Sequence, residues 1–246
     1  MPTKEHIWPA GILRQKGASN FALTPGGKRF YEGEPQIKDV CAECNNNKLS
    51  ALDAYLVYSY ANQFSKKIVF RQPTNFSYKY DLLLRSLLKI AYNSHRANND
   101  KSQIALFGKI KGYILRGSSR PQADIRLQIV TESKVAIGGD EIIYSPDQFR
   151  SVMLNLEPNS PSKIISRLIV LNSYWFFVTV DPESAGRKSI NEAVSRLEGS
   201  RNPSGITLSR SKNSIQIPWS KTTWMDPDLW GQNNLLGVEW PEIKNS

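Results

Sequence analysis

Residues 41–60 read CAECNNNKLSALDAYLVYSY and place two cysteines directly before a helical pattern. The apolar residues of this stretch recur three and four positions apart, at Leu49, Leu52, Leu56 and Tyr60. That spacing puts them on one face of an α-helix. Upstream, the turn-rich stretches PAG, TPGGK and EGEP separate short extended pieces at 20–23 and 36–40. We therefore predict that residues 1–64 form a small, loop-rich module that ends in a helix.

A second short stretch, EHIWP, covers residues 5–9, and 34 residues separate His6 from Cys41. Its residues suit the hydrolysis of a phosphodiester bond, which needs an activated water and a cation that offsets charge in the transition state. The Glu5 carboxylate and the Asn45 amide oxygen are hard ligands that suit Mg²⁺ or Mn²⁺. The neutral imidazole of His6 can accept the proton of the water near pH 7.

The order EHIxP, then CxxCNN, then a helix resembles the HNH, or ββα-metal, endonucleases, and the resemblance covers roughly residues 4–60. It implies a β-hairpin and a helix that hold a catalytic Mg²⁺ or Mn²⁺ between them. By this resemblance Glu5 and Asn45 bind the metal, His6 is the general base, and DNA is the substrate. We therefore expect a metal-dependent endonuclease.

Cys41 and Cys44 have a spacing that suits metal ligation or redox chemistry better than a structural disulfide. The resemblance implies that they form half of a structural zinc site, which many members complete with a CxxC pair upstream of the histidine. Because tetrahedral zinc needs four ligands, we expect a natural start further upstream. Packing in place of zinc, or ligation by His95, are the alternatives, and His95 itself is expected at the surface near a helix end. A redox pair or two small buried hydrophobic residues also stay open.

Asp53 follows Asn45 by eight positions. On one helix this separates the two residues by about 12 Å, too far to share one ion. We expect Asp53 to pair with a basic side chain or to orient the site from outside. A competing hypothesis for the whole chain is a nucleic-acid-binding or partner-binding protein, in a defence or restriction system, whose HNH-like core no longer cuts.

The chain carries 32 Lys and Arg against 22 Asp and Glu, a net charge of +10 that favours polyanionic partners. The candidate DNA contacts are Lys28 and Arg29 in a glycine-rich loop, and Arg85 and Lys89 on a predicted helix. Lys109, Lys111, Arg116 and Arg120 extend the positive charge. A solvated surface is the alternative for all of them. The tryptophans at 219, 224, 230 and 240 are expected to anchor the tail by packing.

Residues 65–246 are predicted to form a second, mixed domain, so that the whole chain is α+β with helices packed on antiparallel strands. We expect a strand at 67–71, a helix around 80–91, a further helix or strand at 103–115, strands from 124 onward, and a helix at 189–198. Strands at 165–171 and 175–180 flank an Asn-Ser turn, and 206–209 and 214–218 suggest a hairpin.

The sequence contains no apolar run of the roughly 18 residues that cross a bilayer. Its first residues, MPTKEHIWPAG, also lack the apolar core of a secretory signal. We therefore expect a cytoplasmic protein without a membrane partner.

Overall fold

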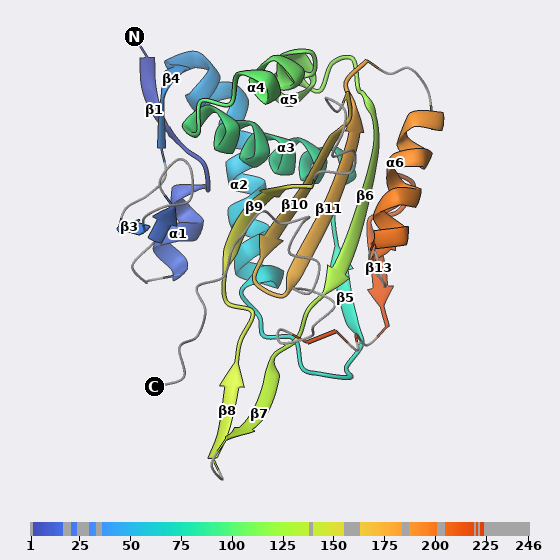
Figure 1. Ribbon diagram of the computed structural model, residues 1–246. Helices are drawn as coiled ribbons and strands as arrows, with labels where there is room; N and C mark the ends of the chain where they lie inside the picture. The colour runs from blue at the N-terminus through green and yellow to red at the C-terminus, as the bar shows by residue number, and fades with distance from the viewer. Residues whose placement is uncertain are drawn as a thin grey trace.

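A computed structural model of the chain describes residues 2–16, 21–23, 30–32, 36–137, 140–154, 163–183, 187–200, 205–218, 220 and 222–223. It is an α+β fold, as predicted, with helices packed on an antiparallel sheet (Figure 1). The strands are β1 Pro2–His6, β2 Phe21–Leu23, β3 Phe30–Glu32, β4 Gln36–Cys41, β5 Thr74–Ser77, β6 Gln122–Ile129, β7 Ser133–Ile137, β8 Asp140–Tyr144, β9 Phe149–Met153, β10 Ile165–Leu171, β11 Tyr174–Asp181, β12 Ile206–Thr207 and β13 Ser214–Ile217. The helices are α1 Ala10–Lys16, α2 Ser50–Ser59, α3 Tyr80–Ala97, α4 Lys101–Gly108, α5 Lys111–Arg116 and α6 Arg187–Ser200, with π-helical turns η1 Cys44–Leu49 and η2 Tyr60–Phe64 before and after α2.

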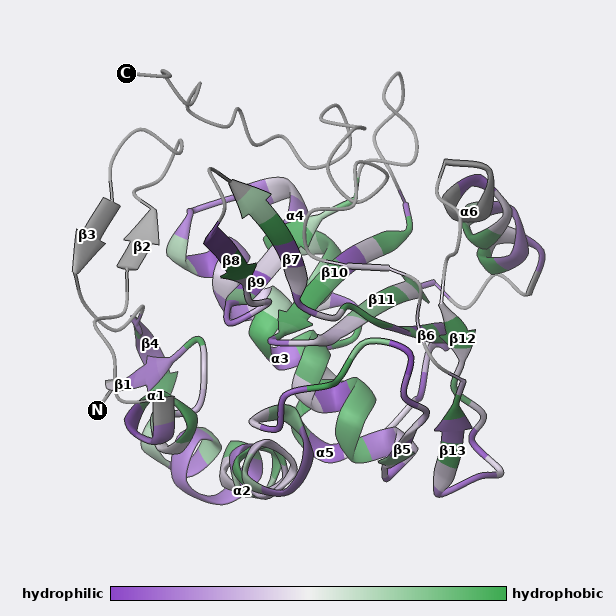
Figure 2. Cartoon of the chain, turned by 90° about the horizontal axis from the view of Figure 1, so that it is seen from below, coloured by the Kyte–Doolittle hydropathy of each residue, from purple (hydrophilic) through white to green (hydrophobic). Residues whose placement is uncertain are grey.

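The central sheet has five antiparallel strands in the order β12-β6-β11-β10-β9. Its two middle strands, β10 and β11, are buried along their whole length. Both faces are covered, because α3 packs on one side and α6 on the other, as Figures 1 and 2 show from two directions. In Figure 2 the hydrophobic residues of α3, β10 and β11 gather in the interior. Burial on both faces explains why the β10 and β11 sequences are almost continuously apolar.

Local patterns predicted several elements correctly. The helix expected around 80–91 is α3, and the strands expected at 165–171 and 175–180 are β10 and β11. Asn172 sits in the turn between them with a φ of 54°, a left-handed conformation that asparagine tolerates better than most residues. The segment 103–115 is helical but divided into α4 and α5, which ends at the left-handed Gly117.

Two predictions about strands were wrong. Residues 67–71 form no strand; the strand is instead β5, which begins at Thr74. Residues 206–209 and 214–218 do not pair with each other either. β12 pairs with β6, and β13 pairs with β5. Each of these pairings joins segments far apart in the sequence, so local spacing carried no signal for them.

The prediction that His95 lies at the surface was also wrong. The residue is buried and only 5% exposed. The Arg167 guanidinium donates to its Nε2 across 2.7 Å, so Nδ1 carries the proton and donates to Asp100 across 3.0 Å. Burial and the neighbouring Arg167 lower the pKa of His95 to about 4. With both ring nitrogens engaged, His95 links the end of α3 to β10 and is not placed to complete a zinc site.

Candidate functional site

The predicted site residues lie in a unit of two strands and one helix. β1 pairs antiparallel with β4, with Glu5 opposite Ile37 and an irregular register between Thr3 and Glu5. β4 ends at Cys41, and the helical segment formed by η1, α2 and η2 follows at once. The apolar face of that segment is buried, as its spacing predicted, through Leu49, Leu52, Leu56 and Tyr60. The helix therefore runs beside the strand that carries Glu5 and His6.

Asn45 fixes the beginning of this helix to β1. Its side-chain nitrogen donates to the Lys4 carbonyl across 2.9 Å and to the Thr3 hydroxyl across 3.1 Å. The Thr3 hydroxyl in turn donates to the Val40 carbonyl of β4 across 2.9 Å. One amide group thus ties both strands to the helix. The structure places Asn45 beside Thr3 and Lys4, so its observed contacts are structural.

Glu5 points into the protein and meets two charged residues there. Its carboxylate pairs with the ammonium group of Lys89 on α3, and the same ammonium lies 2.5 Å from Oδ1 of Asp53 on α2. Glu5 and Lys89 are 3% and 2% exposed, and the Asp53 side chain is 28% exposed. Two carboxylates from different elements therefore converge on one buried positive charge.

The electrostatics of this cluster follow from its burial. Burial raises the pKa of Glu5, because a carboxylate loses its hydration there, and the negative charge of Asp53 raises it further. The charge of Lys89 and its hydrogen bond act in the opposite direction. The cluster has two acidic groups and one basic group. A second positive charge near Glu5 and Asp53 would therefore be electrostatically favourable.

The sequence prediction for this cluster was right in one part and wrong in another. Asp53 pairs with a basic side chain, as expected. Lys89, predicted to contact DNA, is instead buried and bound to two acidic groups, so it has no surface for a phosphate. The signal was present in the sequence, because Lys89 lies within the apolar run LLKIA. A lysine in such a run is rarely buried without acidic partners.

His6 follows Glu5 on β1 and is partly exposed, at the register position of Gln36. The charge of His6 acts to lower the pKa of Glu5, so the imidazole lies close to the buried carboxylate. The imidazole is therefore beside the acidic cluster and partly exposed.

Cys41 and Cys44 flank the junction between β4 and the helix, and both are free thiols. The backbone N–H of Cys44 donates to the Cys41 sulfur across 3.2 Å. Hydrogen bonds from Cys44 lower the pKa of the exposed Cys41 thiol, and the same contact raises the pKa of Cys44. Among the described residues, no three His, Cys, Asp or Glu side chains gather as ligands of one ion.

The other predicted DNA contacts have varied positions. Lys28 and Arg29 lie outside the described residues, as do the tryptophans at 219, 224, 230 and 240. The Arg85 guanidinium donates to the carbonyls of Ile114 and Leu115, each across 3.1 Å, and so holds the end of α5 against α3. Lys109 pairs with Glu183, and Arg120 pairs with Asp81. Lys111 and Arg116 are exposed.

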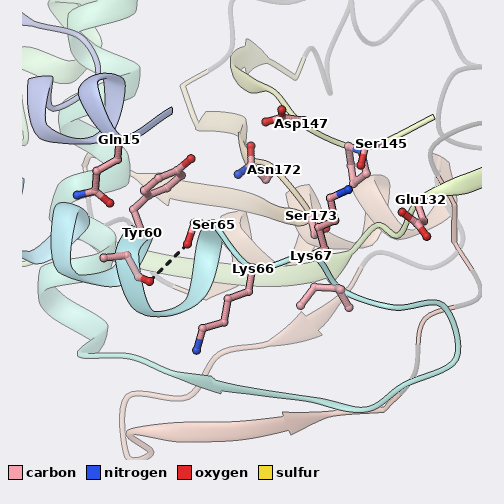
Figure 3. A pocket seen from close by; sticks show the side chains of 13 residues that line it. Gln15, Tyr60, Ser65, Lys66, Lys67, Glu132, Ser145, Asp147, Asn172 and Ser173 are labelled. Carbon is pink, nitrogen blue, oxygen red and sulfur yellow. Dashed lines mark hydrogen bonds between the residues drawn. The ribbon is translucent and has the colours of Figure 1, made fainter. Parts of the chain in front are cut away.

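A separate cavity of 590 Å³ lies at the far end of the helical segment (Figure 3). Its walls include Gln15 of α1, Tyr60 of η2, Lys66 after that turn, and Asp147 and Asn172 from the sheet side. None of the residues predicted from the sequence as catalytic or metal-binding lines it. Acidic and basic side chains both contribute to its walls, so its charge favours no single class of ligand.

No helix in the described part of the chain is both long enough and apolar enough to cross a membrane.

Comparison with known proteins gives no family: no protein-family model matches the sequence, and no characterised protein or solved structure is significantly similar to it.

Proposed function

We propose that this chain is a metal-dependent endonuclease of the HNH type that hydrolyses phosphodiester bonds in DNA. The observation that carries the proposal is the convergence of Glu5 and Asp53 on one cation, next in sequence to a partly exposed His6. The order of two strands and a helix, with Asn45 binding the helix to the first strand, supports it.

The donor groups present fit a hard divalent cation. Mg²⁺ and Mn²⁺ prefer carboxylate oxygens, and Glu5 and Asp53 already share one positive charge, the ammonium of Lys89. We assign a further ligand position to Asp53, whose carboxylate lies beside the same ammonium as Glu5; the Asn45 nitrogen donates to β1, and the Asn45 amide oxygen stays a predicted ligand. A divalent ion held by these acids would offset the charge that develops on the scissile phosphate.

The remaining steps belong to the protein itself. His6 accepts a proton from the attacking water, a role that suits a partly exposed imidazole. Asn45 keeps β1 and the helix in fixed register, which sets the separation between Glu5 and Asp53. Lys89 holds the two carboxylates together when no metal is bound.

A second candidate function is DNA binding without cleavage, and one observation favours it. The Lys89 ammonium already neutralises Glu5 in a position that is 3% exposed. If the ammonium is not displaced, the internal lysine replaces the metal permanently and the protein binds DNA without hydrolysing it.

Nicking of supercoiled plasmid by the full chain tests the first proposal. We expect cleavage that requires Mn²⁺ or Mg²⁺ and falls by about a hundredfold or more in His6→Ala. Asp53→Asn should also lose activity. Asp39→Asn is the matched control, because Asp39 is an exposed acid of the same unit that pairs with Arg96. Undiminished nicking by His6→Ala would contradict the proposal.

Calorimetric titration with Mn²⁺ separates the two candidates. The nuclease proposal expects Mn²⁺ binding that Asp53→Asn and Glu5→Gln both weaken. A chain that binds duplex DNA but neither binds Mn²⁺ nor nicks plasmid would instead support the second candidate.

A further inference from the structure

The short helix α5 abuts the strand–strand–helix unit that carries Glu5, His6 and Asp53. Ile110, Tyr113 and Ile114 bury one side of it, and the Tyr113 hydroxyl donates to Asp81 of α3 across 2.8 Å. Arg85 of α3 binds its last carbonyls. On its other flank α5 contacts η1, the turn that begins the helix of the unit. Its position relative to the candidate site is therefore fixed from two sides.

Two exposed positive charges stand at the ends of α5, Lys111 at its first residue and Arg116 at its last. The pKa of Asp39 on β4 is lowered mainly by its hydrogen bond to Arg96, and the charge of Lys111 lowers it further. The pKa of Lys48 on η1 is raised mainly by its hydrogen bond to Glu43, and the charge of Arg116 opposes this. Lys111 thus lies near β4, and Arg116 lies near η1.

The acids of this region form their ion pairs with other cations. Asp39 pairs with Arg96, and Glu43 pairs with Lys48 across 2.7 Å. Within the described part of the chain, neither Lys111 nor Arg116 forms an ion pair of its own. Lys109, only two residues before Lys111, differs in this respect because it pairs with Glu183 across 2.5 Å. Positive charge is therefore in excess beside η1.

We infer that Lys111 and Arg116 bind the phosphate backbone of DNA and hold it beside the Glu5–Asp53 site; this inference rests on the proposed function. The two residues are five positions apart, a rise of about 7.5 Å along a helix. Five positions also turn the chain by about 140° around the helix axis, so the two cations lie on either side of the buried face of α5 and can contact different phosphates of one duplex. Because such contacts read no bases, they position the duplex without selecting a sequence.

The test measures binding of a fluorescent DNA duplex by the full-length His6→Ala chain across a range of salt concentrations. Each lost phosphate contact lowers the slope of log affinity against log salt by about 0.9. We expect Lys111→Gln/Arg116→Gln to lower that slope by about 1.8 and to weaken binding roughly tenfold or more at 0.1 M salt. The matched control, Lys109→Gln/Lys134→Gln, removes the same net charge from two lysines that pair with Glu183 and Glu141.

An unchanged slope in the Lys111→Gln/Arg116→Gln chain, or an equal loss in both double variants, would overturn the inference. Absence of DNA binding by the His6→Ala chain would overturn it too, together with DNA as the partner. Plasmid nicking is measured separately in the His6-containing chain. A chain that binds DNA through Lys111 and Arg116 but never nicks would leave the inference standing and contradict only the nuclease proposal.

Discussion

At the scale of single residues, the buried charges of this protein are held by partners from other elements. Lys89 lies between Glu5 and Asp53, and Arg167 lies against His95 and Ser151. A buried charge destabilises the folded state unless it is paired. Removing one member of such a group therefore leaves a buried charge without a counter-charge. Both groups therefore lead to predictions about stability.

Replacing Lys89 with methionine should destabilise the fold by about 3–5 kcal/mol in metal-free buffer, because it leaves Glu5 buried without a counter-charge. Urea denaturation at pH 7 measures the effect. The double variant Glu5→Gln/Lys89→Met should recover a large part of the loss, since neither charge then remains unpaired. Lys101→Met, at an exposed position, is the control and should stay within about 0.5 kcal/mol. A loss below about 1 kcal/mol in Lys89→Met would contradict the burial of this ion pair.

His95 should make stability fall as the pH falls from neutral. Its pKa is about 4 in the folded chain and about 6.5 when unfolded, so between these values the unfolded state binds more protons. The His95 contribution is therefore fully present above pH 6.5 and is lost as pH approaches 4, by about 3 kcal/mol at most. Glu5, whose pKa is raised, acts in the opposite direction.

The difference between the parent and His95→Gln isolates this contribution. Urea unfolding at several pH values between 4 and 7 should show a weaker acid destabilisation in His95→Gln than in the parent. Equal pH dependence in the two chains would show that burial and Arg167 do not hold His95 neutral.

At the scale of elements, glycine marks where two helices approach closely. A Cβ added at Gly11 of α1 would lie 2.8 Å from Cγ2 of Val57 on α2, a separation that requires one helix to shift. Valine is stiff at χ1, so its side chain cannot rotate freely out of the way. The approach of α1 to α2 thus depends on the absence of a side chain at position 11.

Gly11→Ala should destabilise the protein by about 1–3 kcal/mol, although alanine favours helices. Gly108→Ala is the matched control, because nothing lies within 4 Å of a Cβ added there, and it should stabilise the chain by about 0.5–1 kcal/mol. Thermal unfolding compares the two. If both glycines respond alike, α1 and α2 are not in close contact; relief in Gly11→Ala/Val57→Ala would confirm the contact.

The domain boundary predicted between residues 64 and 65 lies within one continuous hydrophobic core. One cluster of buried side chains extends from Ile7 to Ile217. Phe64 itself has its ring centroid 5.0 Å from that of Tyr174 and 6.0 Å from that of Phe76. The strand–strand–helix unit is thus packed on α3 and on the sheet, and its Glu5 depends on Lys89 for charge neutralisation.

Residues 1–64 expressed alone should therefore not reach the structure that they have in the full chain. We expect a nearly unfolded circular dichroism spectrum and poorly dispersed amide NMR signals, because the fragment exposes Leu52, Leu56 and Phe64 and lacks Lys89. The full chain is the control. A cooperatively folded fragment would instead support the two-domain division predicted from the sequence.

Features that depend on near neighbours could be predicted from the order of residues alone. Apolar spacing predicted α3, α6 and the helix after Cys44, and the Asn172-Ser173 turn between two apolar runs predicted the β10–β11 hairpin. The motif resemblance pointed to two separate stretches, one with Glu5 and His6 and one with Asn45, and their roles stay predictions. Periodicity succeeds here because each helix or hairpin shows locally which of its faces is apolar.

Contacts between residues far apart in the chain were known only once the fold was known. Lys89 is 36 positions from Asp53, and nothing in either local sequence says that α3 covers α2 and β1. The same holds for β5, whose partner β13 comes from near the other end of the chain, and for Lys109, which Glu183 neutralises while Lys111 stays exposed. An apolar face or a charge requires a partner, but its own sequence does not name that partner; packing of the whole chain selects it.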